Sequence, residues 1–242
     1  MSSVKRIFVG GMIAMNSAVL ASEDAYRVVT FGDSTTADRG GKRKYSAQLA
    51  KTFPAIKVIN KGIGGHTTAM AARRFQADVL DQNPNLVVIQ FGINDAAVDV
   101  WKTPPAESSR VSLADYEANL RRFVTEIQGA GAEVILMTPN QVRWTPALLE
   151  MYGKPPYDPE DVQGFSRILG TYAQVVRQLA EELNVPLVDV YSFYDTPERR
   201  ATACVELLPD GMHPSEKGHA LVAGELAKVL EQKISKEASG TP

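Results

Sequence analysis

Residues 28–35 read Val-Val-Thr-Phe-Gly-Asp-Ser-Thr, an apolar run that ends abruptly in a glycine, an aspartate and a serine. The apolar half predicts a short buried strand, and the glycine and aspartate are typical of a turn. Open parallel α/β sheets keep their functional groups beyond the carboxyl ends of the strands. The stretch therefore predicts that the Ser34 hydroxyl stands at the functional edge of such a sheet.

Four further apolar segments repeat this strand pattern, and segments with helical spacing separate them. The predicted strands are 57–59, 86–89, 134–137 and 186–190, and the predicted helices are 45–53, 67–82, 112–127, 162–179 and one that begins near residue 215. Short parallel strands need crossover connections, and these are right-handed. The pattern predicts an α/β fold of the flavodoxin-like type, a three-layer α/β/α sandwich with a five-stranded parallel sheet.

The composition is that of an ordinary globular protein. Of 242 residues, 44% are apolar and 22% are charged, the formal net charge is -2 and the pI is about 6.0. No internal repeat divides the chain, so we expect a single domain over residues 22–242, with a polar, frayed tail at 235–242. The weak acidity gives no basic footprint for nucleic acid, and we expect no nucleic-acid partner. The sequence leaves the oligomeric state open.

The first 21 residues have the pattern of a signal peptide. Lys5 and Arg6 precede an apolar segment, residues 7–21, and polar residues follow it. The segment is shorter than the roughly 20 apolar residues of a membrane span. An uncleaved anchor and a buried first strand are the alternatives. We expect removal of residues 1–21, which would change the net charge from -2 to -4 and leave a secreted or periplasmic protein without stable membrane association.

Cysteine and histidine usage argues against bound metals and cofactors. Cys204 is the only cysteine, so the chain forms no internal disulfide. There is no H-E-x-x-H motif and no pairing of cysteine with histidine, so we expect no metal centre. The glycines at 62–65 lack the third small residue of a dinucleotide fingerprint and follow the second predicted strand rather than the first. We expect no cofactor.

Four short motifs follow the predicted strands, and they are Gly32-Asp33-Ser34, the glycine turn 62–65, Gly92-Ile93-Asn94-Asp95 and Asp210-Gly211-Met212-His213. Because the carboxyl ends of parallel strands share one edge, these motifs can meet in a single crevice. The amide of Asn94 could there donate to a developing oxyanion. On its own, the Asn94-Asp95 pair could equally be a turn, and we interpret Asp95 as structural or as a helix cap.

His213 is the candidate general base for Ser34. A serine is a poor nucleophile until a base takes its proton, and the chain has only three histidines. Asp210 precedes His213 by three residues, so the two can share a turn and a hydrogen bond that orients the imidazole. The alternative is that this segment simply leads into the last helix. His219 lies within that helix, where we expect it to be a packing or surface residue.

In this order and spacing, the four motifs resemble the sequence blocks of the SGNH (GDSL-type) serine hydrolases. Thr35 stands where this family usually has leucine, a variant found among its carbohydrate acetylesterases. The resemblance implies the SGNH hydrolase fold and a catalytic triad of Ser34, His213 and Asp210. It also implies an oxyanion hole formed by the Ser34 N–H, the Gly65 N–H and the Asn94 amide, with Gly65 chosen because it follows Asn60 by five residues.

The substrate expectation rests on the long loop 138–160. Arg143 and Trp144 are its candidate substrate-binding residues, and they could form a stacking wall for a sugar with Asn140, Tyr152 and Tyr157. Together with the resemblance to carbohydrate acetylesterases, this predicts a serine esterase that hydrolyses small acyl esters, in particular acetyl esters, on carbohydrate.

Three other readings remain beside this one. The first is a lysophospholipase, thioesterase or arylesterase that acts on longer acyl chains. The second is a binding module that keeps the fold without catalysis. A lipase of the α/β-hydrolase type is disfavoured, because the chain has no G-x-S-x-G motif and its candidate aspartate and histidine are close neighbours.

Overall fold

The computed structural model describes residues 25–38, 44–196 and 206–239, and within them five parallel strands form one sheet. The strand order is β2-β1-β3-β4-β5, which confirms the predicted doubly wound arrangement. The strands are β1 (Arg27–Gly32), β2 (Lys57–Gly62), β3 (Leu86–Gln90), β4 (Glu133–Met137) and β5 (Leu187–Val188). The interior strand β1 pairs with β2 on one side and with β3 on the other, so the segment that carries Ser34 is fixed along both edges.

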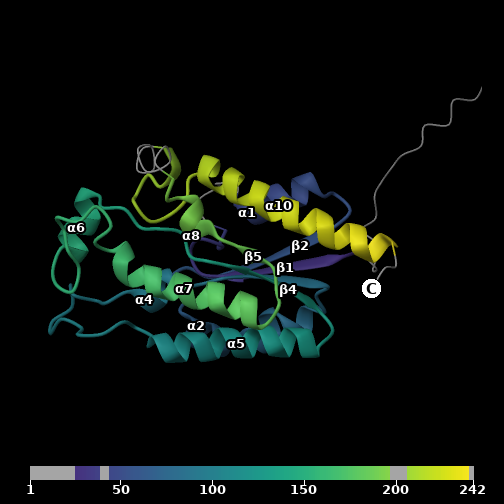
Figure 1. Ribbon diagram of the computed structural model, residues 1–242, viewed down its shortest axis with the longest axis horizontal. Helices are drawn as coiled ribbons and strands as arrows, with labels where there is room; N and C mark the ends of the chain where they lie inside the picture. Colours follow the sequence, from purple (N-terminus) through teal and green to yellow (C-terminus); the bar gives the residue numbers. More distant parts are fainter. Residues whose placement is uncertain (1–24, 39–43, 197–205, 240–242) are drawn as a thin grey trace, which may run out of the picture.

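Helices cover both faces of the sheet (Figure 1). One face carries α1 (Tyr45–Thr52) and α10 (Glu216–Ser239), and the other carries α2 (Thr68–Ala72), α5 (Leu113–Gly129) and α7 (Ser166–Glu182). The short helices are α3 (Phe75–Asp78), η1 (Leu80–Gln82), α4 (Ile93–Ala96), α6 (Pro146–Tyr152) and α8 (Val190–Phe193). The predicted three-layer sandwich is therefore present.

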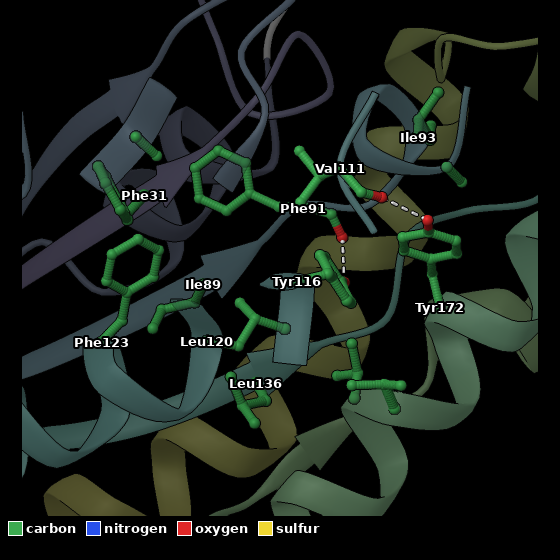
Figure 2. Packing of buried hydrophobic residues seen from close by; sticks show 14 of the residues in the cluster. Phe31, Ile89, Phe91, Ile93, Val111, Tyr116, Leu120, Phe123, Leu136 and Tyr172 are labelled. Carbon is green, nitrogen blue, oxygen red and sulfur yellow. Dashed lines mark hydrogen bonds between the residues drawn. The ribbon is translucent and has the colours of Figure 1, made fainter. Parts of the chain in front are cut away.

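Each strand contributes to two separate apolar clusters, because successive side chains of a strand point to opposite faces. Val29 and Phe31 belong to the larger cluster beneath α5 and α7, whereas Val28 packs in the smaller one beneath α1 and α10. This explains the nearly continuous apolar sequences of β3 and β4. In Figure 2 the ring of Phe31 lies among other aromatic rings of the larger cluster, with centroid separations of 5.2 Å to Phe91 and 5.6 Å to Phe123.

The predicted helix 67–82 is wrong as a continuous element, because the structure divides it into α2, α3 and η1. The break falls at Arg73 and Arg74. The guanidinium of Arg74 donates to the carbonyl oxygens of Gly32 and Lys61 and lies 4.6 Å from the centre of the Phe31 ring. These tertiary contacts outweigh the helix propensity of an alanine-rich segment.

Two other predicted boundaries differ from the structure. The helix expected from residue 162 begins at Ser166, because the preceding residues form turns in which the Gly164 N–H donates to the Asp161 carbonyl. The loop 138–160 contains α6, whose first turn is capped by Thr145 and begins with Pro146.

The last helix extends further toward the C-terminal end than the sequence predicts. Helix α10 continues to Ser239, into the segment 235–242 that the sequence predicts as a tail. The predicted signal peptide and Cys204 lie outside the described residues. Among the residues that are described, no helix has the length and apolar character needed to cross a membrane.

Candidate active site

Ser34 lies in a single helical turn directly after β1. The N–H groups of Thr36 and Ala37 both donate to the carbonyl of Asp33, at 3.2 and 2.9 Å, and this closes the turn at the carboxyl edge of the sheet. Ser34 is only 6% exposed. Its hydroxyl is therefore held at the position that the sequence predicts for it, at the carboxyl end of an interior strand.

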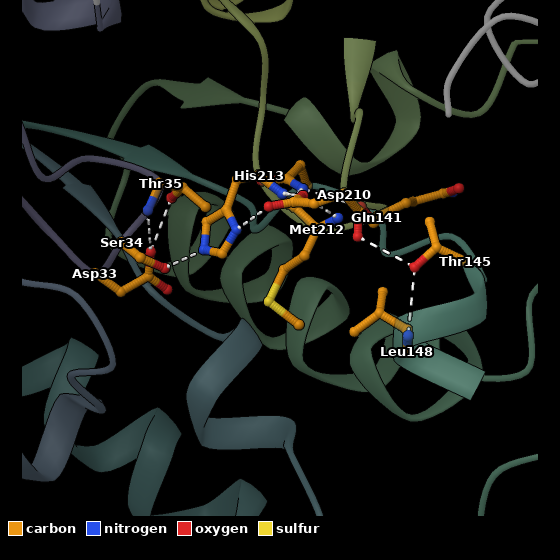
Figure 3. A network of polar contacts seen from close by, with 10 residues as sticks. Asp33, Ser34, Thr35, Gln141, Thr145, Leu148, Asp210, Met212 and His213 are labelled. Atoms are coloured by element: carbon orange, nitrogen blue, oxygen red, sulfur yellow. Dashed lines mark hydrogen bonds and ion pairs between the residues drawn. The ribbon is translucent and has the colours of Figure 1, made fainter. Parts of the chain in front are cut away.

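Three side chains form a hydrogen-bonded row at this edge (Figure 3). The Nε2 atom of His213 lies 2.9 Å from the Ser34 Oγ, across 179 positions of sequence, and the Nδ1 atom lies 2.8 Å from Asp210 Oδ2. A carboxylate only accepts hydrogen bonds, so in the neutral ring the proton sits on Nδ1 and Nε2 can accept the serine proton. The arrangement can generate a nucleophilic serine.

Asp210 is held as a carboxylate by its own neighbours. Its Oδ1 accepts hydrogen bonds from the backbone N–H groups of Met212 and His213, at 2.9 and 2.6 Å. Partial burial raises the pKa of Asp210, but the hydrogen bonds from His213 and Met212 outweigh burial and hold this pKa well below its usual range. The negative charge that orients His213 is therefore present throughout the neutral pH range.

The segment that carries His213 is braced by the loop after β4. Asn140 Nδ2 donates to the carbonyl of Met212 at 2.9 Å, and the Arg143 N–H donates to the carbonyl of Gly211 at 2.7 Å. Gly211 has a φ of +81°, and a Cβ there would lie 2.2 Å from the backbone carbonyl oxygen of Arg143. A larger residue would therefore push the segment that carries His213 away from the loop after β4. The loop therefore sets the position of the imidazole.

The contacts of Arg143 and Trp144 differ from the predicted substrate wall. Arg143 is 4% exposed, and its Nη2 lies 3.5 Å from Asp195 Oδ1. The indole N–H of Trp144 donates to the carbonyls of Asp158 and Asp161 at 3.3 and 2.9 Å. Burial of Arg143 argues against direct contact with a substrate, and Trp144 stabilises the loop with its polar atom. The fully buried Asn140, expected in the same wall, supports the His213 segment instead.

The three oxyanion-hole candidates lie on the segments that directly follow β1, β2 and β3. The His66 N–H donates to the carbonyl of Ile63, and Gly65, in the third position of this turn, has a φ of +79°, which a type II turn requires. Asn94 lies in α4, and its Nδ2 donates to the His66 carbonyl at 3.2 Å. Within the described residues, the N–H groups of Ser34 and Gly65 donate to no protein acceptor. Both can therefore serve a ligand.

Asp95 has the structural role that the sequence suggests. Its Oδ1 accepts from the N–H and the hydroxyl of Thr68, at 2.8 and 2.5 Å, and so anchors the start of α2. Burial raises the pKa of Asp95 to about 7 against the opposing effect of these hydrogen bonds. His219 is likewise a packing residue, since it is 1% exposed and its ring centre lies 6.2 Å from that of Tyr45.

Sequence reasoning missed two groups of residues that support the site. Arg110 donates from Nη1 to Asn94 Oδ1 at 3.1 Å. Thr35 joins the nucleophile turn to the end of β3, because its hydroxyl lies within hydrogen-bonding distance of both Asp33 Oδ1 and Gln90 Oε1. The contacts Arg110–Asn94 and Thr35–Gln90 have no local signal in the sequence, since the partners come from separate segments of the chain. Among the described residues, no group of three or more His, Cys, Asp or Glu could hold a metal ion.

At the edge of the parallel sheet, Ser34 is hydrogen-bonded to His213, and His213 is hydrogen-bonded to Asp210. Serine hydrolases have this arrangement of a serine, a histidine and an aspartate. A model of the GDSL-like Lipase/Acylhydrolase family matches residues 30–221, and the chain belongs to this family. The protein is thus a carboxylic-ester hydrolase, as the resemblance predicts.

Three relatives illustrate this membership. The chain is 33% identical over 180 residues to an acetylxylan esterase of Geobacillus stearothermophilus, a match that covers 72% of this chain and 73% of that one. It is 32% identical over 216 residues to the uncharacterized lipoprotein YqeF of Bacillus subtilis, over 81% and 85% of the two chains. The crystal structure of Axe2, an acetylxylan esterase from Geobacillus stearothermophilus, matches with a TM-score of 0.66 at 28% identity, over 84% and 93% of the chains.

The raised pKa of Asp95 predicts a pH dependence of stability. Between the ordinary value of 3.8 and about 7, the folded protein keeps a proton that the unfolded chain has released. The free energy of unfolding therefore falls as the pH rises through this range. In Asp95→Asn the group does not titrate, so the fall between about pH 4.5 and about pH 7 should be smaller than in the wild type. Urea unfolding at both pH values measures it, and equal falls would contradict the assignment.

Proposed function

We propose that Ser34 attacks an ester carbonyl while His213 takes the serine proton. The observation that carries this proposal is the row of two short contacts, 2.9 Å from Ser34 to His213 and 2.8 Å from His213 to Asp210. His213 then gives its proton to the departing alcohol, which leaves an acyl-enzyme. A water molecule that His213 deprotonates hydrolyses the acyl-enzyme, and Asp210 keeps the imidazole in the required tautomer in both steps.

The oxyanion of each tetrahedral intermediate is held by the N–H groups of Ser34 and Gly65 and by the amide of Asn94. All three donors come from the ends of neighbouring strands β1, β2 and β3. The absence of protein acceptors for the two backbone donors within the described residues supports this role. Donors that are fixed before the reaction stabilise developing charge without reorganisation in the transition state.

The substrate class is a small acyl ester, in particular an acetyl ester, on carbohydrate. The relatives named acetylxylan esterase support this choice. The geometry supports it as well, because the side chains of Asp210 and His213 are 56% and 28% exposed. An ester group on a bulky carbohydrate can reach a row of groups that opens at the surface, while the sugar stays outside. The partly exposed ring of Trp144 is the candidate contact for the sugar.

The second candidate is a lysophospholipase, thioesterase or arylesterase for longer acyl chains. Two exposed apolar side chains favour it, namely Ile63 at 39% and Met70 at 44% exposure, on the Gly65 turn and on the following helix. They could cover an acyl chain that extends past the oxyanion hole.

Two substitutions test the catalytic roles. Ser34→Ala should leave only background esterase activity and should abolish labelling by a fluorophosphonate, because the nucleophile is gone.

Asn94→Ala should lower kcat by about 10²- to 10³-fold, the usual cost of one lost oxyanion donor. Rates on p-nitrophenyl acetate, together with melting curves that verify folding, measure both. A wild-type protein that resists the fluorophosphonate would identify the chain as a binding module instead.

The acyl preference separates the two candidate substrate classes. We expect kcat/KM to be highest for acetyl in a series of p-nitrophenyl esters from acetyl to decanoyl, and we expect acetate release from acetylated xylan. The Ile63→Ser variant serves as a control, because it should change the rates on short chains little. A preference of the wild type for long chains, lost in Ile63→Ser, would overturn the acetylesterase proposal in favour of the second candidate.

We also propose that the chain is exported and that residues 1–21 are removed. The basic and apolar pattern of this segment supports export. One relative is named a lipoprotein, whereas the only cysteine of this chain is Cys204, far from the cleavage region. Expression of the whole chain in a bacterium, followed by N-terminal sequencing, should give a mature protein that begins near Ser22 outside the cytoplasm. Recovery of the intact N-terminus from the cytoplasm would contradict this.

A further inference from the structure

The amide of Asn94 has a single allowed orientation. Its Oδ1 accepts from Arg110 Nη1 at 3.1 Å, and its Nδ2 donates to the His66 carbonyl at 3.2 Å. A guanidinium has no acceptor and a carbonyl has no donor, so both neighbours require the same assignment of oxygen and nitrogen. One N–H of the amide is used by His66. Burial raises the pKa of the Asp33 carboxyl beside Ser34, and a hydrogen bond from the Asn94 side chain opposes this rise, so the second N–H is directed toward the nucleophile turn, where the oxyanion would form.

Arg110 is in turn held by a buried carboxylate. Its Nε and Nη2 donate to Asp99 Oδ1 at 2.9 and 2.6 Å, and Lys102 Nζ lies 2.7 Å from Asp99 Oδ2. The Asp99 side chain is 4% exposed. Burial raises the pKa of Asp99, but the two cations outweigh burial and lower it, so this carboxylate keeps its charge at neutral pH.

The backbone fixes the same arrangement. The N–H of Arg110 donates to the Ala97 carbonyl at 3.0 Å, and the N–H of Val111 donates to the Asp95 carbonyl at 3.2 Å. The segment between Asn94 and Arg110 therefore forms a loop whose end is hydrogen-bonded to its beginning at α4. Because a planar guanidinium offers several donors in a rigid fork, one side chain can hold Asp99 and Asn94 together.

We propose that Arg110 is a positioning residue of the oxyanion hole, which holds the Asn94 amide toward the reacting carbonyl and strengthens its N–H as a donor. The proposal deepens the proposed function and rests on it. A cation on the amide oxygen draws electron density from the nitrogen, so the second N–H becomes a better donor to a developing negative charge. Arg110 itself touches no reacting atom in this role.

This role has a kinetic signature. An interaction that matters only when charge develops on the oxyanion lowers kcat and leaves KM nearly unchanged, whereas a contact with the substrate raises KM. The effect should also be the same for different ester alcohols. It should disappear when Asn94 is absent, because Arg110 acts through that amide.

The rate at which a fluorophosphonate reacts with Ser34 tests the proposal without choosing a substrate, because the phosphoryl oxygen enters the oxyanion hole. We expect a loss of about tenfold in Arg110→Met, a fraction of the cost of losing a whole oxyanion donor. Arg110→Lys should lose less, since it keeps the charge but cannot bridge Asp99 and Asn94. Arg122→Met is the matched control, because Arg122 pairs with Glu126 on the surface of α5, and its rate should equal that of the wild type.

A double-mutant cycle completes the experiment. If Arg110 acts through Asn94, the double variant Asn94→Ala/Arg110→Met should react at the rate of Asn94→Ala alone. Should Arg110→Met fail to fold, the same cycle is run with Arg110→Lys. An unchanged rate in the Arg110 variants, independent additive losses, or a rise in KM confined to polar substrates would overturn the proposal while leaving the esterase function intact. A wild-type Ser34 that does not react would overturn both.

Discussion

The parallel pairing of strand β1 with both of its neighbours constrains the rest of the structure. Because β1 hydrogen-bonds to β2 on one side and to β3 on the other, the residues after all three strands emerge at one edge of the sheet. This pairing brings Ser34, the Gly65 turn and Asn94 to the same edge. Strands β1, β3 and β4 are buried on both faces, so a shift in their register would move apolar residues of two clusters at once. The relative positions of these groups therefore follow from the register of the strands.

Around this edge, polar residues of distant loops hold each reactive group. Asn140 and the Arg143 backbone brace the segment that carries His213, Arg74 binds the carbonyl of Gly32 before the nucleophile, and Arg110 holds Asn94. All of these donors lie in or beside the buried part of the protein, where an unpaired polar group is costly. Their partners are mostly backbone carbonyls, so the support depends on the path of the chain. This explains how short loops can maintain distances below 3 Å between groups far apart in sequence.

Features that depend on interactions between residues close in sequence were predicted, whereas features that depend on distant contacts were not. The strands and the amphipathic helix α5 are local features, and their predicted positions agree with the structure within a few residues. The continuous helix 67–82 fails because Arg74 is bound by carbonyls of β1 and β2, which no local pattern shows. Arg143 was a candidate substrate-binding residue, yet the loop folds its side chain into the interior.

The sequence by itself determined the class of fold, the succession of strands and helices along the chain and the identities of the groups that can react, because periodicity and short motifs are encoded over a few residues. Only the tertiary structure could bring Ser34 within 2.9 Å of His213 and set Arg110 against Asn94. It also turned the polar residues after β4 from a possible substrate surface into a support for His213. The physical reason is that hydrogen-bond partners are selected by the packing of the whole chain, which closes long loops between residues that carry no mutual signal in the sequence.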